Sequence, residues 1–347
     1  MKRSIDYYSH TSIGEAAIRA RMDHVNRLQA EELPDDPPLL VEDAVVRMRN
    51  LPSTTVMHFW VLWHDDRIVA QCRLDWAELE SNRAAAGVDI TVEAPLRRQG
   101  IATSLLRRAL AVAQNANRPR LFSGSSDRVP AGSAFLKAIG SQPKIEAHVN
   151  QLAVDRLDPQ LMASWRALGR SRARDYVLEL WDGPIPEARL TAFAELANVM
   201  NSAPRGELEI EDTKITPAMI RERETCFFSI GNRQLISCAR HVPTGALAGY
   251  TELSWNPKRA ALVWQGDTGV VEAHRNRGLG RWLKATNIAA LLRENGAARF
   301  VRTGNADSNA PMLAINRKMG FVPFIAETGW QGHAADIAGA IEKGRAA

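Results

Sequence analysis

Short stretches with alternating apolar and polar positions recur along this chain, and stretches with helical spacing lie between them. The alternation predicts strands over 54–63, 67–75, 87–92, 120–123, 147–154, 176–181, 234–241, 246–255 and 260–271. The helical spacing predicts helices over 11–31, 103–114, 131–139, 158–175, 187–200, 217–225 and 281–293. Two pairs of strands are separated only by short polar turns, which predicts hairpins. The pattern therefore predicts an α/β fold in which each half has a mixed, mostly antiparallel sheet flanked by helices.

The two halves of the chain carry the same short motif. Residues 97–102 and 275–280 both read R-x-x-G-x-(G/A), and each lies between a predicted strand and a predicted helix. Gly100 and Gly278 are 178 positions apart, and a second matching pair, Gly140 and Gly320, is 180 apart. Because chance matches would not keep this register, we infer a duplicated domain. We expect an N-terminal domain over 1–157, a connecting helix over 158–175 and a C-terminal domain over 176–347.

A glycine loop between a strand and a helix is suited to binding an anion. The first N–H groups of a helix have no partner within the helix, and the helix dipole favours negative charge there. Glycine allows close approach of the backbone to a phosphate, and the flanking arginines add charge-assisted contacts. The duplicated motif thus predicts two cradles for a pyrophosphate.

The motif resembles the acetyl-CoA signature of the GNAT acetyltransferase superfamily. In that superfamily an Asn-rich turn, a helix and a terminal Gly-Phe follow the signature, and residues 303–321 of this chain match that order. The chain is similar to the tandem two-domain type found in actinobacteria, an architecture that mycothiol synthase shares. The resemblance implies acetyl-CoA as cosubstrate and an acyltransferase activity.

The resemblance also implies which residues hold acetyl-CoA. In the second half these are Val270, Val271, Arg275, Arg277, Gly278, Leu279, Gly280, Arg281, Asn309 and Asn316. In the first half they are Arg98, Gln99, Gly100, Ile101, Ala102 and Thr103. Asn309 also precedes a helix with a proline just inside it, so it is equally a candidate N-cap. Asn316 stands where many members have a tyrosine that protonates the leaving thiolate, and an asparagine cannot supply that proton.

The general base is expected on the strand before the second cradle. An amine must lose a proton to attack a thioester, and a carboxylate can accept it directly or through water. Gly266 permits a bulge that would turn Asp267 toward a site, so Asp267 is the first candidate and Glu252 on the preceding strand is the second. Glu224 and His241 are weaker candidates. The loop 200–205 is a candidate for acceptor recognition.

The first half departs from the family pattern. It has no counterpart of Asn309, and Gly140-Ser141 stands where Gly-Phe is expected. We therefore expect the second domain to carry the chemistry and the first to be non-catalytic. The expected function is direct transfer of an acetyl group from acetyl-CoA to an amine of a small molecule. Three alternatives remain: acetylation of a protein or peptide, a non-catalytic acyl-CoA-binding module, and a longer acyl donor in place of the acetyl group.

Composition limits the kinds of partner and the cellular compartment that we expect for the protein. The 347 residues carry a net charge of +5 without a run of basic residues, which does not indicate a nucleic-acid partner. Three cysteines, at positions 72, 226 and 238, lack the spacing of metal ligands and suit a reducing compartment. No segment has the length and apolarity of a membrane helix. The sequence thus predicts a cytoplasmic protein of monomer size that needs no metal.

Overall fold

The computed structural model describes residues 3–346, which form two compact units. Unit 1 contains residues up to 146, residues 206–211 and the residues from 326 onward. Unit 2 contains residues 147–205 and 212–325. The units therefore do not divide the chain as the predicted domains 1–157 and 176–347 would, because each unit includes a strand that the sequence places in the other half.

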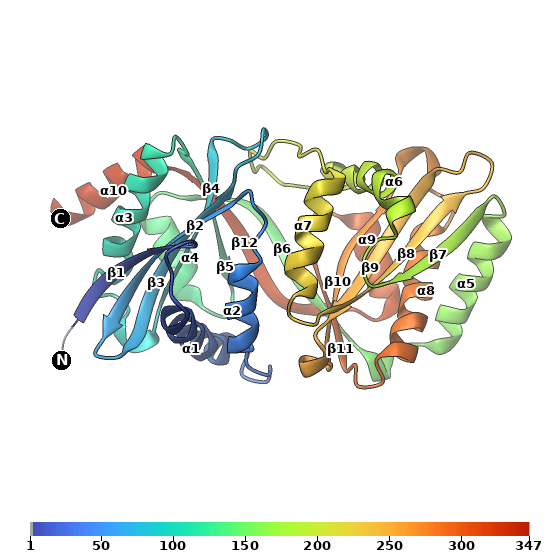
Figure 1. The fold of residues 1–347 in the computed structure, drawn as a ribbon, viewed down its shortest axis with the longest axis horizontal. Helices are drawn as coiled ribbons and strands as arrows, with labels where there is room; N and C mark the ends of the chain where they lie inside the picture. Colours follow the sequence, from blue (N-terminus) through green and yellow to red (C-terminus); the bar gives the residue numbers. More distant parts are fainter. Residues whose placement is uncertain (1–2, 347) are drawn as a thin grey trace. The chain divides into compact units, whose positions relative to one another are not determined.

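Unit 1 is a sheet with helices on both faces (Figure 1). Its strands follow the order β1-β2-β3-β4-β5-β12, and all neighbours are antiparallel except β4 and β5. The strands are β1 (Arg3–Ser9), β2 (Thr55–His64), β3 (Arg67–Ala77), β4 (Ala85–Val92), β5 (Arg120–Ser126) and β12 (Val322–His333). The helices are α1 (Glu15–Glu32), α2 (Val41–Arg49), α3 (Ile101–Asn115), α4 (Pro130–Ala138) and α10 (Ala334–Ala346).

Unit 2 repeats this plan. Its strands follow the order β6-β11-β10-β9-β8-β7, and only β10 and β11 are parallel. The strands are β6 (Gln142–Ala153), β7 (Tyr176–Asp182), β8 (Arg233–His241), β9 (Leu247–Trp255), β10 (Leu262–Val270) and β11 (Phe300–Ala306). The helices are α5 (Pro159–Arg172), α6 (Glu187–Ala197), α7 (Pro217–Phe228), α8 (Leu279–Glu294) and α9 (Ala310–Met319). The predicted fold class is confirmed.

The two halves of the chain exchange their last strands. Residues 147–153 of β6 pair with β11 of unit 2, and residues 327–333 of β12 pair with β5 of unit 1. Residues 206–211 also join unit 1, where the Glu207 N–H donates to the Lys144 carbonyl at 2.8 Å. Each sheet is therefore completed by a strand from the other half of the sequence.

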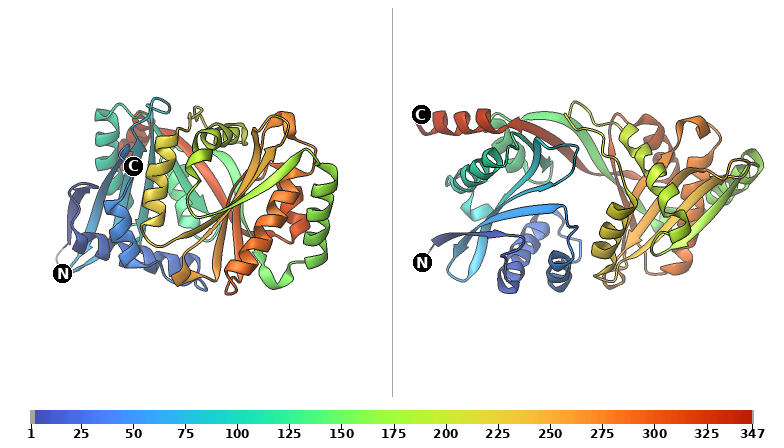
Figure 2. Two further views of the ribbon diagram at one scale, coloured as in Figure 1. Left: turned by 45° about the vertical axis from the view of Figure 1, so that its right-hand side comes forward. Right: turned by 45° about the horizontal axis from the view of Figure 1, so that its top comes forward.

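Alternating side chains on the strands supply a core on each face of the sheets. In unit 2, Ile236 and Cys238 pack toward α6 and α7, whereas Leu235 lies on the opposite face in the core that includes α5 and α8. In unit 1, α1 and α2 lie on one face and α3 and α10 on the other (Figure 2). The segment predicted as a connecting helix is α5, whose Gly169 fits directly against the Trp282 ring of α8. It is therefore an integral part of unit 2.

Four elements of unit 1, namely β1, α2, β12 and α10, are absent from the sequence-based prediction. β1 consists mostly of partly exposed residues, and α2 is only 9 residues long. Neither shows a sustained apolar face, because each is held mainly by its neighbours in the tertiary structure. By contrast, α3 and α8 were predicted, and each begins directly after its glycine loop, at Ile101 and Leu279.

The strand exchange predicts that neither half of the chain folds alone. A chain of residues 1–157 lacks β12, so β5 would have an unpaired edge and unit 1 would lose α10. We expect residues 1–157 and 158–347, produced separately, to show no cooperative thermal transition by circular dichroism, and their coexpression to restore one. A sharp transition for residues 1–157 alone would contradict this expectation.

Candidate functional site

A gap opens in the sheet of unit 2 between β10 and β11. The two parallel strands pair only over Leu262–Trp264 and Phe300–Arg302. Beyond these three residue pairs, β10 continues to pair with β9, and β11 continues to pair with β6. The backbone of both strands thus leaves room between them for a ligand.

A β-bulge lies on β10 beside this gap. Gln265 pairs with Leu253 and Thr268 with Thr251, so Gly266 and Asp267 together oppose the single residue Glu252. A Cβ atom at position 266 would lie 2.9 Å from Cγ of Glu252, so a larger residue there would displace the Glu252 side chain. The bulge turns the neighbouring Asp267 away from the regular strand alternation.

The bulge brings two carboxyl groups together. The Asp267 N–H donates to Oε1 of Glu252 at 3.1 Å, and Nε2 of Gln234 donates to Oε2 of Glu252 at 2.9 Å. The Tyr250 hydroxyl donates to Oδ2 of Asp267 at 3.2 Å. Burial raises the pKa of Glu252 to about 7, and the negative charge of Asp267 adds to this shift. Desolvation also raises the pKa of Asp267, against the opposing effects of Tyr250 and the Arg223 charge.

A cavity of about 220 Å³ occupies this part of unit 2. Asp267 and Thr268 of β10 line it, together with residues of β11, α8, α9 and the segment that follows α6. The lining residues are Met200, Ala203, Pro204, Gly266, Asp267, Thr268, Lys284, Thr303, Gly304, Asn305, Ala306, Asn309 and Met312. The cavity therefore unites the first candidate base, Asp267, with the loop expected to recognise the acceptor.

The second glycine loop is formed at the N-terminus of α8. Gly278 has φ of 82°, a conformation that favours glycine, and a Cβ at this position would meet nothing within 4 Å. Nε of Arg275 donates to the Val270 carbonyl at 3.0 Å and so holds the loop against β10. The side chain of Leu279 is buried in the core. The loop therefore offers its backbone to solvent, with open space beside Gly278, whereas a Cβ at Gly280 would contact Cδ1 of Ile315 at 3.5 Å.

Two of the predicted arginines lie against aromatic rings. The Arg277 guanidinium is 6.0 Å from the centre of the Tyr176 ring, and that of Arg281 is 5.7 Å from the Trp165 ring. These cation–π contacts orient both side chains near the loop, and neither guanidinium forms an ion pair with a described residue.

The remaining predicted residues of the second half occupy different settings. Asn309 is the N-cap of α9, with Oδ1 accepting from the Met312 N–H at 3.4 Å, and it also lines the cavity. Asn316 is buried behind the cavity and donates to Oδ1 of Asn305 at 2.8 Å. The Val271 N–H already donates to the Ala248 carbonyl, so it is not free to bind a pantetheine group.

The first glycine loop has the same geometry as the second. Gly100 has φ of 74° and open space where a Cβ would lie. Nε of Arg97 donates to the Val92 carbonyl at 3.0 Å, the equivalent of the Arg275 contact. Arg97 also forms a bidentate ion pair with Glu31 of α1 at 2.6 and 2.7 Å.

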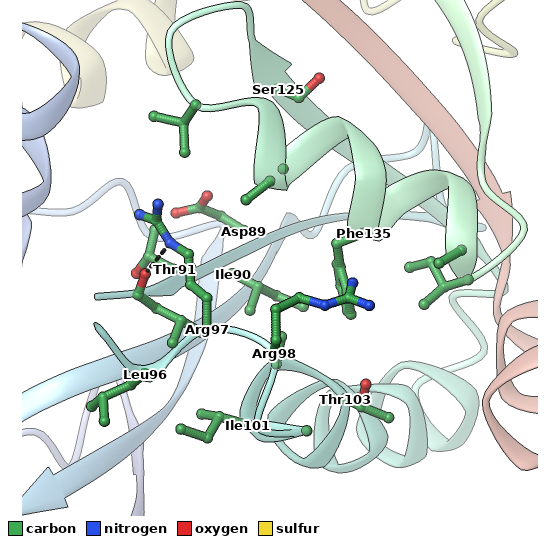
Figure 3. Close-up of a pocket in the computed structure, with 18 of the residues that line it drawn as sticks. Asp89, Ile90, Thr91, Leu96, Arg97, Arg98, Ile101, Thr103, Ser125 and Phe135 are labelled. Atoms are coloured by element: carbon green, nitrogen blue, oxygen red, sulfur yellow. Dashed lines mark hydrogen bonds between the residues drawn. The ribbon is translucent and has the colours of Figure 1, made fainter. Parts of the chain in front are cut away.

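A larger cavity, of about 760 Å³, lies at this loop in unit 1. Figure 3 shows Arg98, Thr103 and Phe135 around it. Gly100, Ile101 and Ala102 also line it, whereas Gln99 does not and donates instead to the Pro95 carbonyl. Residues of α1 and α10, including Glu31 and Ile341, complete the wall. Unit 1 thus holds five of its six predicted residues around one cavity.

Unit 1 lacks the special backbone features of unit 2. β4 pairs with β3 without a bulge from Gly87 to Val92, although Asp89 of this strand lines the cavity. The residue before α4 is Val129, which forms no side-chain cap, whereas Asn309 caps α9. The two units share the loop but differ in the groups that surround it.

The other two candidate bases lie away from the cavity lining. Glu224 is buried and accepts from the Ile185 N–H at 2.7 Å and from Arg221. His241 contacts Thr244 through Nδ1 at 2.8 Å. Sequence reasoning missed Lys284 and Tyr250, which the structure places beside the cavity and beside Asp267 respectively. A lysine between Leu283 and Ala285 on a mainly apolar helix face is the signal that would have revealed the first.

Comparison with known proteins identifies this arrangement. Residues 22–155 match the sequence model of the acetyltransferase (GNAT) family. The structure is similar to that of a tandem GNAT protein from the clavulanic acid biosynthesis pathway, solved without AcCoA, with a TM-score of 0.75 and 25% identity. That similarity covers 95% of this chain and 99% of the other. The chain has the tandem GNAT architecture.

Other solved structures share the tandem GNAT fold at lower identity. A GCN5-related N-acetyltransferase from Sphaerobacter thermophilus has a TM-score of 0.66 at 15% identity, covering 95% of this chain and 96% of that one. A glucosamine N-acetyltransferase region of a fungal GH3 β-N-acetylglucosaminidase has a TM-score of 0.63 at 13% identity, covering 95% of this chain and 38% of that one. No curated protein sequence matches this chain.

The segment of this chain that matches the GNAT family model lies in its first half. The sequence motifs are more complete in the second half, but the family model covers 22–155, which includes the first glycine loop and most of unit 1. The first half therefore keeps the match to the family's sequence model, whereas the second half keeps the more complete set of motifs. Within residues 3–346, no helix combines the length and apolarity needed to cross a membrane.

The raised pKa of Glu252 predicts an effect on stability. The folded state keeps a proton on Glu252 up to about pH 7, whereas an unfolded chain loses it near pH 4.5. Ionisation therefore reduces the free energy of unfolding as the pH rises between these values. We expect Glu252→Gln to raise the melting temperature at pH 8 by more than at pH 5.

The exposed Glu195 on α6 provides the control for this measurement. Glu195→Gln should show no such difference between the two pH values in differential scanning calorimetry. An equal effect of both substitutions would show that Glu252 is not held in a desolvated position.

Proposed function

We propose that the protein is an N-acetyltransferase that moves an acetyl group from acetyl-CoA directly to an amine of a small molecule, and that unit 2 carries the chemistry. One observation supports this most strongly. Asp267 projects from a bulge, is hydrogen-bonded to Glu252 through its N–H, and lines a cavity at the gap between β10 and β11. Acetyl-CoA supplies the thioester, and the chain supplies the remaining groups.

The residues of the second loop fit the pyrophosphate of acetyl-CoA. The first N–H groups of α8 point out of the helix end, and no atom lies within 4 Å of a Cβ built on Gly278. Arg277 and Arg281 lie nearby without an ion-pair partner among the described residues. A phosphate can therefore approach the backbone closely and gain charge-assisted contacts.

The carboxyl pair is suited to accepting the proton of the amine. Asp267 lines the cavity, and Glu252 lies behind it at hydrogen-bonding distance from the Asp267 backbone. Their raised pKa values bring a proton acceptor closer to neutral pH, where a general base works best. Because the two groups interact, the pair rather than either residue sets the observed titration.

The bulge also offers backbone groups for the developing negative charge of the thioester oxygen. The Asp267 N–H is already donated to Glu252, so this role falls to another main-chain N–H of the bulge. Asn316 does not supply a proton to the thiolate, which we propose leaves with the help of water.

Direct transfer is supported by the state of the cysteines. Cys72, Cys226 and Cys238 are all buried, and burial raises the pKa of Cys72 and Cys238 well above the usual range of a thiol. A protonated, enclosed thiol is a poor nucleophile. None of the three lines either cavity.

A small acceptor is favoured over a protein. The cavity of about 220 Å³ is walled by Met200, Ala203 and Pro204, which leaves space for a compact molecule rather than an extended chain. For unit 1, the 760 Å³ cavity at the first loop supports binding of a second acyl-CoA without turnover. That role agrees with the lack of a bulge and of an Asn309 counterpart.

One prediction of the proposed function concerns Gly278. Gly278→Glu introduces a negative charge at the proposed pyrophosphate site, and we expect acetyl-CoA turnover to fall at least tenfold. Gly278→Ala imposes the same unfavourable φ without the charge and should lose much less. Gly100→Glu should spare most of the turnover but remove acyl-CoA binding by unit 1. Calorimetric titration and thiol release measure these outcomes, and loss of turnover only in Gly100→Glu would place the chemistry in unit 1.

Another prediction of the proposed function concerns Asp267. Asp267→Asn keeps the shape but removes the proton acceptor, so kcat/KM should fall about 100-fold. The loss should shrink at high pH, where the amine is already unprotonated. Affinity for acetyl-CoA should stay the same. Unchanged rates over the whole pH range would assign the base to Glu252 instead.

A further inference from the structure

Lys284 is a charged residue buried in unit 2. It lies on α8, has an exposed fraction of 1%, and lines the cavity that also contains Asp267. Its ammonium forms no hydrogen bond or ion pair with any described residue, and the nearest aromatic ring, that of Phe321, is 6.0 Å from Nζ. Burial lowers the pKa of Lys284 to about 7.

Other buried charged groups of unit 2 have partners. Nε of Arg302 donates to Oε1 of Gln151 at 2.7 Å, and Glu224 pairs with Arg221. An unpaired buried charge is costly, so proteins rarely keep one without a use. Burial therefore disfavours the charged form of Lys284 in the free protein, and a ligand that brings a negative charge into the cavity would restore that form and give Nζ the partner it lacks.

The fold itself does not require a lysine at this position. Gly278 and Gly100 are equivalent, and the same spacing from Gly100 leads to Leu106, which is fully buried in the core of unit 1. An apolar side chain thus satisfies the packing of this helix against the sheet. The lysine is a feature of the unit 2 cavity rather than of the helix.

The cavity arranges complementary groups at two places. Lys284 and the amide of Asn305 supply hydrogen-bond donors, because Oδ1 of Asn305 already accepts from Asn316. Asp267 supplies a carboxylate. Met200 and Met312 provide apolar wall between the polar groups. One ligand with an anionic and a cationic end would satisfy both charges.

We propose that Lys284 binds the carboxylate of the acceptor, so that the acceptor is an amino acid or another short amino carboxylate whose amine lies at Asp267. This inference rests on the proposed N-acetyltransferase function, because it defines which amine the same site accepts. A carboxylate would form charge-assisted hydrogen bonds with the ammonium and keep it protonated. The volume of about 220 Å³ suits a molecule of this size.

The test compares acceptors with and without the carboxylate, with each rate corrected for the fraction of free amine. Glycine, L-alanine, L-leucine and 4-aminobutyrate are each paired with the decarboxylated amine: methylamine, ethylamine, isoamylamine and propylamine. Thiol release from acetyl-CoA gives kcat and KM, and the melting temperature reports binding without turnover. We expect at least one amino carboxylate to exceed its amine at least tenfold in kcat/KM and to raise the melting temperature.

Two variants test whether Lys284 causes the preference for an amino carboxylate over its decarboxylated amine. Lys284→Met keeps an unbranched apolar stem and removes the charge. In this variant the kcat/KM of each amino carboxylate should approach that of its amine, because the KM of the amino carboxylate rises. Lys318→Met removes the same charge from the exposed face of α9 and should keep the ratio. A persistent preference in Lys284→Met, or no preference in the wild-type protein, would overturn the proposal.

The remaining outcomes separate this proposal from the proposed function. If Lys284→Met lowers kcat equally for both members of a pair with KM unchanged, Lys284 serves the leaving thiolate and the proposal is wrong. If no acceptor is acetylated but amino carboxylates still raise the melting temperature in a Lys284-dependent manner, the binding proposal holds and the N-acetyltransferase function fails. If neither turnover nor stabilisation is observed, the binding proposal fails as well.

Discussion

The site in each unit depends on a pair of parallel strands that hydrogen-bond briefly and then separate. In unit 2 the pairing of β10 with β11 covers three residue pairs, and in unit 1 the pairing of β4 with β5 also covers three. A sheet normally satisfies its backbone groups through continuous pairing. Where pairing stops, the strands can tolerate a gap only because each keeps its other neighbour, β9 or β6 in unit 2 and β3 or β12 in unit 1. The glycine loops, cavities and helix N-termini are all placed by this separation.

The two units have specialised this common plan in different ways. Unit 1 has the larger cavity, which α1 and α10 help to enclose, and its β4 remains regular. Unit 2 has a smaller cavity, but one residue inserted into β10 creates a bulge in which the Asp267 N–H donates to the Glu252 carboxylate. Replacement of Leu106 by Lys284 at the equivalent helical position adds a charge to the second cavity. The two cavities thus differ in their backbone geometry and in their charged groups.

Local signals in the sequence predicted the local parts of this structure. Glycines 100 and 278 mark loops with positive φ, Gly266 marks the bulge, and Asn309 with Pro311 marks a helix start, because each effect depends on a residue's own backbone or its near neighbours. The predicted α/β class and the tandem arrangement follow from the same kind of signal. The contact between Asp267 and Glu252, the isolation of Lys284 and the exchange of β6 and β12 depend on residues far apart in the sequence. Alternation along a strand shows that it has a buried face but does not show which strand lies beside it.

The strand exchange also affects the order in which the molecule can mature during synthesis. β5 ends at residue 126, but its antiparallel partner begins only at residue 327, about 200 residues later. Until residues 327–346 have left the ribosome, β5 presents an unpaired edge and the apolar residues that α10 covers are open to solvent. Contacts between such distant residues form slowly, and exposed edges favour misassembly. Residues 327–346 therefore complete, late in synthesis, the unit whose other strands are made first.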